Sequence, residues 1–178
     1  TPLLGGAGIF FAFALTTTAI AWRTGAPFEG RMSPFELAAV LLGGLVLVMG
    51  GYLDDRWRLR PWQQLCFPLL AVGIAAASGI GISRVTNPLG GVLTLAPIVT
   101  VAFTICWLLG TTYTTKLLDG LDGLVAGMTA IGALLITALS LTHRFYQPDV
   151  AVLALALAGA CIGFLIFNIA PARIFLGE

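Results

Sequence analysis

Long apolar segments constrain the fold of this chain more than any other feature of its sequence. The hydrocarbon core of a bilayer is about 30 Å thick, and a helix crosses it with about 20 apolar residues. Six segments have roughly this length: residues 5–22, 35–53, 64–82, 96–112, 123–142 and 149–168. A chain in lipid must satisfy every backbone N–H and C=O internally, so these segments must be helices. The sequence therefore predicts an all-α fold, a polytopic transmembrane helix bundle that forms a single domain over residues 1–178.

The composition agrees with a lipid environment and excludes other classes of protein. Charged residues make up 10% of the chain and hydrophobic residues 58%, whereas soluble proteins carry about 25% charged residues. The net charge is +1, and without a basic tail or arm the chain is not expected to bind nucleic acid. Both ends of the chain resemble the interiors of motifs, so we expect a fragment of a longer protein.

If all six segments cross the bilayer, the connections between them alternate between its two sides. One side then holds the N-terminus and residues 54–63, 113–122 and 169–178. The other side holds residues 23–34, 83–95 and 143–148. Turn residues between β-branched runs in the 83–95 segment predict a short hairpin.

Loop charges orient this arrangement, because Lys and Arg are enriched on the cytoplasmic side of membrane proteins. The first side carries Arg56, Arg58, Arg60, Lys116 and Arg173. The second side carries Arg23, Arg31, Arg84 and Arg144. The difference favours a cytoplasmic position for the first side and a non-cytoplasmic position for the hairpin.

Asp54 and Asp55 follow the second apolar segment directly. A carboxylate at the bilayer centre costs roughly 2.5–3.5 kcal/mol, so this pair should lie at the interface or face a cation or a water-filled cavity. A simpler interpretation is a helix end at which polar residues meet water.

Asp119 and Asp122 are three residues apart, which on a helix places them on nearly the same face as Lys116. Gly120 and Gly123 leave room beside the carboxylates for a close approach by a phosphate. Like charges at this spacing repel unless Lys116 or a divalent cation neutralises them, and Mg²⁺ prefers one or two carboxylates with water and substrate phosphates. We therefore expect a phosphate and metal site. The alternative is an acidic helix start that complements the helix dipole.

A cationic stretch follows Asp55 and contains Arg56, Arg58 and Arg60 among tryptophans. Guanidinium groups bind phosphates with two parallel hydrogen bonds, so these residues are candidates for an anionic lipid headgroup or a diphosphate. The alternative is an aromatic belt with the positive charge that is usual on the cytoplasmic side.

Four motifs together resemble the polyprenyl-phosphate N-acetylhexosamine-1-phosphate transferases, glycosyltransferase family 4. They are Thr1–Gly6, Gly51–Asp55, Leu118–Leu124 and Pro171–Gly177. The family includes the bacterial undecaprenyl-phosphate GlcNAc-1-phosphate and phospho-N-acetylmuramoyl-pentapeptide transferases. The resemblance covers nearly the whole chain in order and spacing.

This resemblance implies an enzyme of the bacterial cytoplasmic membrane, with many spans and an active site facing the cytoplasm. Family members use Mg²⁺, with Mn²⁺ as an alternative, to transfer a sugar-1-phosphate from a UDP-sugar to polyprenyl phosphate and release UMP. A homodimer is left open.

The resemblance also implies roles for individual residues. Asp54 and Asp55 match the pair that activates the lipid phosphate or assists the metal. Asp119 and Asp122 match the pair at the nucleotide and diphosphate site. Glu178 stands at the position of a metal-binding Asp, so we expect Mg²⁺ to be held by Glu178 with Asp119 or Asp54. The expected contacts to substrate come from Thr1, Lys116, Arg56, Arg58 and Arg60.

The chain departs from the family pattern at three positions. Tyr113 and Lys116 stand where the family usually has Asn, and Glu178 stands where it has Asp. Lys116 could replace part of the charge of the metal or contact a phosphate directly. These departures indicate a divergent subfamily whose substrate and metal dependence can differ.

Three alternatives compete with the transferase hypothesis. A CDP-alcohol phosphotransferase also uses paired Asp-Gly units, but its first unit is followed two residues later by Ala-Arg, which this chain lacks. A transporter or ion pathway would place carboxylates near the middle of the spans. Thirdly, the chain could be an inactive fragment or scaffold.

Overall fold

The computed structural model describes residues 5–24, 32–87 and 90–177. The described part consists of six helices and one two-stranded sheet. In chain order these are α1 (Gly5–Thr24), α2 (Pro34–Trp57), α3 (Pro61–Ala77), β1 (Arg84–Thr86), β2 (Val92–Thr94), α4 (Pro97–Leu118), α5 (Leu124–Ser140) and α6 (Pro148–Asn168). The all-α class predicted from the apolar segments is confirmed.

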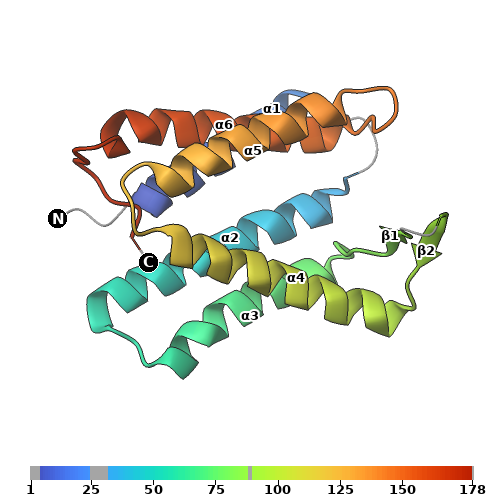
Figure 1. The fold of residues 1–178 in the computed structure, drawn as a ribbon, viewed down its shortest axis with the longest axis horizontal. Helices are drawn as coiled ribbons and strands as arrows, with labels where there is room; N and C mark the ends of the chain where they lie inside the picture. The colour runs from blue at the N-terminus through green and yellow to red at the C-terminus, as the bar shows by residue number, and fades with distance from the viewer. Residues whose placement is uncertain (1–4, 25–31, 88–89, 178) are drawn as a thin grey trace.

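The helices form two layers, which Figure 1 shows one above the other. The first layer contains α1, α5 and α6, with α6 packed against both of the others. The second contains α2, α3 and α4, with α3 packed against both of the others. The layers meet through α1 with α2 and through α4 with α5, and both of these contacts are sparse.

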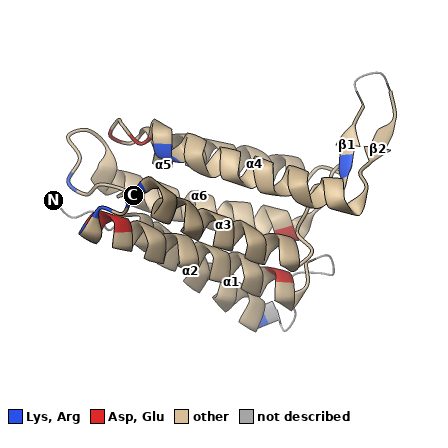
Figure 2. Ribbon diagram, turned by 90° about the horizontal axis from the view of Figure 1, so that it is seen from below, with Lys and Arg blue, Asp and Glu red and all other residues tan. Residues whose placement is uncertain are grey.

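Charged residues lie mainly at the two ends of the bundle and in the loops, while the middles of the helices are almost free of them (Figure 2). Four helices, α1, α2, α4 and α6, are long and apolar enough to cross a membrane. The other two, α3 and α5, are also apolar but have 17 residues each. At 1.5 Å per residue they are about 25 Å long. Each is shorter than the span predicted for it, residues 64–82 for α3 and 123–142 for α5.

Several helix ends differ from the predicted boundaries. The predicted fourth span stops at residue 112, but α4 continues to Leu118. The polar residues there fit a helix because their hydroxyls bond back to carbonyls of the preceding turn, as Thr112 does to Leu108 and Thr115 to Thr111. Likewise α2 continues to Trp57, so Asp54 and Asp55 lie in its last turn rather than beyond it.

The predicted hairpin is present at the opposite end of the bundle. Strands β1 and β2 are antiparallel, with Arg84 opposite Thr94 and Thr86 opposite Val92. The side of the membrane on which the hairpin lies stays a prediction.

Candidate functional site

A cavity of about 1030 Å³ lies at the end of the bundle where α2 and α4 finish and α3 and α5 begin. Asp54, Asp55, Lys116, Asp119 and Asp122 all contribute to its lining. The loop after α6 completes it with Phe175, Leu176 and Gly177. The structure thus brings described residues of the 54–63, 113–122 and 169–178 segments together around one cavity. That these segments lie on the same side of a membrane stays a prediction.

Asp54 is buried, with 7% of its surface exposed, and its carboxylate is held from three directions. Its Oδ1 accepts hydrogen bonds from the Leu59 backbone N–H and the Gln64 Nε2, each at 2.9 Å. Its Oδ2 lies 3.5 Å from the Lys116 Nζ. A buried carboxylate is stable only when it is paired and hydrogen-bonded, and Asp54 meets this condition.

Lys116 connects α4 to the beginning of α3 as well as to the end of α2. Its Nζ lies 3.5 Å from the Gln64 Oε1 in addition to Asp54. The Lys116 side chain is 36% exposed, against 8% for the Asp54 side chain. The ammonium thus forms part of the cavity wall, and the carboxylate beneath it is enclosed. Asp55, the next residue of α2, is half-buried and lines the same cavity.

The prediction that Asp119 and Asp122 share one face of a helix is wrong. Helix α4 ends at Leu118 and Asp119 caps it with φ −77° and ψ 37°. Helix α5 begins only at Leu124, after Gly123 with φ 75°. Glycine adopts this left-handed conformation without steric cost, so the second glycine of the motif favours a turn over a continuous helix. The two carboxylates therefore lie on the double-glycine turn, residues 119–123.

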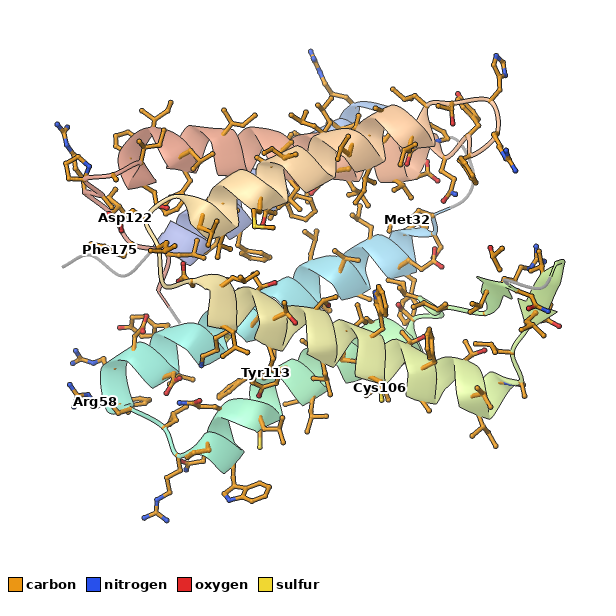
Figure 3. All side chains as sticks on the ribbon, viewed as in Figure 1. Met32, Arg58, Cys106, Tyr113, Asp122 and Phe175 are labelled. Atoms are coloured by element: carbon orange, nitrogen blue, oxygen red, sulfur yellow. The ribbon has the colours of Figure 1, made fainter. Side chains whose placement is uncertain are left out.

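The double-glycine turn contacts the 169–177 loop directly. The Asp122 Oδ2 accepts a hydrogen bond from the Ala172 backbone N–H at 3.2 Å. Figure 3 shows Asp122 and Phe175 near each other at the same end of the molecule. Asp122 and Phe175 both line the cavity, so the double-glycine turn and the 169–177 loop each contribute to its wall.

Asn168 is a site residue that the sequence motifs did not identify. It is the last residue of α6, it is 7% exposed, and it lines the cavity. Its Oδ1 accepts a hydrogen bond from the Gly123 N–H, and its Nδ2 donates one to the Ile174 carbonyl, each at 2.9 Å. The signal available in the sequence was a carboxamide at the end of an apolar segment, where a polar side chain needs a partner.

The beginning of α1 holds the far part of the 169–177 loop. The Gly5 and Gly6 backbone N–H groups donate to the Phe175 and Leu176 carbonyls at 3.1 and 2.8 Å. The first N–H groups of a helix have no acceptor within the helix. Here the loop supplies carbonyl acceptors for two of these N–H groups. The loop is therefore held by α1, by Asn168 and by Asp122.

We expect Gly5→Ala to displace this loop in the full-length protein. A Cβ at Gly5 would lie 2.5 Å from the Phe164 ring and from the Phe175 carbonyl oxygen. Overpacking of this kind costs about 1–3 kcal/mol, so thermal unfolding in detergent should occur at a lower temperature. Gly8→Ala is the control, because no atom lies within 4 Å of its Cβ position. Equal unfolding temperatures for the two variants would contradict the close contact at Gly5.

Other predicted site residues lie outside the cavity lining or outside the described residues. Arg56, Arg58 and Arg60 are exposed, and none of them lines the cavity. Figure 3 shows Arg58 at the outer end of α2. Their role toward an anionic headgroup stays a prediction. Thr1 and Glu178 lie outside the described residues, although Gly177, which precedes Glu178, lines the cavity.

The described carboxylates can supply only part of the coordination shell of a metal ion. Within the described ranges, no group of three or more His, Cys, Asp or Glu side chains could hold an ion by itself. Mg²⁺ requires only one or two carboxylates when phosphates and water complete its shell. Asp119 in the cavity wall suits this arrangement. Asp54 suits it less, because both of its oxygens already face nitrogen donors.

The sequence is similar to a known protein family and to several bacterial proteins over the segments that form this site. The model of glycosyl transferase family 4 matches residues 37–178. A decaprenyl-phosphate N-acetylglucosaminephosphotransferase of Mycolicibacterium smegmatis is 31% identical over 188 residues, which covers 100% of this chain and 46% of that protein. A phospho-N-acetylmuramoyl-pentapeptide-transferase of Latilactobacillus sakei is 39% identical over 123 residues, or 67% of this chain and 38% of that protein.

A third relative, a probable undecaprenyl-phosphate N-acetylglucosaminyl 1-phosphate transferase of Bacillus subtilis, is 29% identical over 186 residues, covering 99% of this chain and 46% of that protein. The chain spans about half the length of these relatives, or less. The family match extends from the first turn of α2 to the end of the chain, and so includes both aspartate pairs and the 169–177 loop. The chain belongs to glycosyl transferase family 4.

Proposed function

We propose that the full-length protein transfers a sugar-1-phosphate from a UDP-sugar to polyprenyl phosphate at the cytoplasmic face of the bacterial inner membrane. The sugar is expected to be an N-acetylhexosamine, and the lipid-linked product would serve synthesis of a cell-envelope glycan. One observation carries the proposal: Asp54, Asp55, Lys116, Asp119 and Asp122 line a single cavity at the end of an apolar helix bundle.

The proposed reaction is a phosphoryl transfer. An oxygen of the polyprenyl phosphate forms a bond to the phosphorus that bears the sugar, and the bond from that phosphorus to UMP breaks. Charge spreads over the phosphoryl oxygens in the transition state, so the main tasks of the protein are positioning and electrostatic stabilisation. The Lys116 ammonium in the cavity wall is suited to both tasks.

The two members of the first aspartate pair have different surroundings, which supports different roles. Asp54 is enclosed and bound by Leu59, Gln64 and Lys116. Asp55 is more exposed and lines the same cavity. We assign to Asp55 the task of orienting or deprotonating the lipid phosphate, while Asp54 fixes the position of Lys116.

Glu178 and Asp119 are the residues that would hold Mg²⁺ in this proposal, with substrate phosphates as further ligands. The ion, when bound, supplies positive charge to the diphosphate. Asp122 and the double-glycine turn would face the nucleotide side of the donor.

The lining of the cavity also suits an amphiphilic acceptor. Leu47, Phe67 and Pro68 line the part of it that extends along α2 and α3, away from the charged end. The first isoprenoid units of a polyprenyl phosphate can bury apolar surface there while its phosphate stays near Lys116.

A UMP-release assay on the full-length protein tests the proposal. Purified protein is incubated with a panel of UDP-sugars, with or without polyprenyl phosphate, and with Mg²⁺, Mn²⁺ or a chelator. We expect UMP to form only when one UDP-sugar, the lipid phosphate and a divalent cation are all present. UMP release that is independent of the lipid, or its absence with every UDP-sugar, would contradict the proposal.

The transporter alternative receives less support. It predicts carboxylates in the middle of the spans, but the described acidic residues of the helices lie in their first or last turns. These residues are Glu36, Asp54, Asp55 and Asp149.

A further inference from the structure

Asn168 connects two segments that belong to separate sequence motifs, the double-glycine turn and the 169–177 loop. Its carboxamide contacts the backbone of the double-glycine turn at Gly123 and the backbone of the 169–177 loop at Ile174. Gly123 is 45 residues before Asn168 in the chain. The amide thus uses its acceptor on one segment and its donor on the other.

The surroundings make this pairing specific. Asn168 is nearly fully buried at the end of the most apolar candidate span, where an unpaired carboxamide would be costly. Helices α5 and α6 pack extensively against each other, which gives both segments a common base. A Cβ at Gly123 would lie 3.5 Å from the Asn168 backbone carbonyl oxygen, which is van der Waals contact, so the turn lies directly against the end of α6.

A second link between these segments, from the Ala172 N–H to the Asp122 Oδ2, is of a different kind. It is exposed and uses a carboxylate that is a candidate for substrate contact. If Asp122 turns to the substrate, this link opens. The Asn168 link remains, because its partners on both segments are backbone groups.

We propose that Asn168 is a positioning residue that fixes the spacing between the double-glycine turn and the 169–177 loop. This spacing sets the distance of Asp119 and Asp122 from the residues at the end of the loop. The inference rests on the proposed function, because it concerns how donor-side groups of that site are aligned. Misplacement of reacting groups by about 1 Å can cost a factor of about 10² in rate.

Asn168→Asp is the sharpest test, because it preserves the shape of the side chain. One carboxylate oxygen can still accept from the Gly123 N–H, but the other faces the Ile174 carbonyl without a proton to donate. We expect kcat for UMP release to fall about 10- to 100-fold, while the KM for polyprenyl phosphate stays within about twofold of wild type, because the acceptor side is lined by α2, α3 and α4. Asn168→Ala removes both hydrogen bonds and should likewise lower kcat while leaving the KM for polyprenyl phosphate nearly unchanged.

Thr104→Val is the matched control at the hairpin end of the bundle. Thr104 is 2% exposed, accepts from the Ile82 N–H at 2.9 Å and donates to the Thr100 carbonyl at 2.7 Å. Its replacement should lower the unfolding temperature in detergent and leave kcat and both KM values unchanged.

The possible outcomes separate this inference from the proposed function. No UMP release by the wild type would reject the function itself. Wild-type kcat in folded Asn168→Asp, an equal rise in both KM values, or a kinetic loss in Thr104→Val like that of Asn168→Ala would overturn the role of Asn168. Failure of both Asn168 variants to fold would also overturn it, because the proposal requires a folded protein with a displaced loop.

Discussion

Asp119→Asn in the full-length protein is expected to lower kcat for UMP release by about 10²–10³-fold, the range typical for loss of one preorganised electrostatic contact. Asp119 caps α4 and lines the cavity beside Lys116. The amide keeps the size of the side chain but removes the negative charge that would help to hold a divalent cation. The apparent affinity for Mg²⁺, measured by titration of the activity, should fall together with kcat.

Glu36→Gln is the matched control for this substitution. Glu36 belongs to the capping box at the start of α2, at the opposite end of the helix from Asp54. Glutamine also completes a capping box, so stability and activity should both stay close to wild type. Wild-type UMP release in both Asp119→Asn and Asp54→Asn would refute the assigned site.

Lys116→Met is expected to affect both stability and catalysis. The substitution removes the ammonium that lies 3.5 Å from the Asp54 Oδ2 and leaves that enclosed carboxylate with the Leu59 and Gln64 donors alone. Loss of a partner by a buried polar group costs about 1–3 kcal/mol. Removal of the cation from the proposed phosphoryl-transfer site should lower kcat/KM by about 10²-fold. Denaturation in detergent and UMP-release kinetics measure the two effects.

A double-mutant cycle with Asp54→Asn isolates the contribution of the Lys116–Asp54 pair. The asparagine amide can still accept from the Leu59 N–H, but its NH₂ group would then face Lys116. The double variant should therefore lose less stability than the sum of the two single losses. Strict additivity would show that the two groups act independently. Lys116→Arg keeps the charge and should recover part of the stability.

The general architecture could be predicted from the sequence because lipid leaves few choices. Six apolar runs required helices, and alternation of their connections grouped the Asp54–Asp55 pair with the Asp119–Asp122 pair. The hairpin could be predicted as well, since turn residues separate two β-branched runs. These inferences depend only on the composition and length of individual segments, which can be read directly from the sequence.

The details of the site depended on contacts between distant segments. The continuation of α4 through a threonine-rich stretch requires hydroxyls that bond to their own helix, as at Thr112 and Thr115. The spacing of Asp119 and Asp122 fits a helix as well as a turn, and only the left-handed Gly123 decides between them. Asn168 carries no local motif, because its partners lie on two other segments.

The sparse contact between the two helix layers has a mechanical consequence. Asp54 and Asp55 belong to the layer of α2, α3 and α4, whereas Asn168 and the loop that it holds belong to the layer of α1, α5 and α6. The double-glycine turn is the covalent bridge between the layers on this side. Any rocking of one layer against the other would therefore change the gap between the parts of the cavity that we propose to face the acceptor and the donor. A pair of substrates bound across that gap would resist the motion.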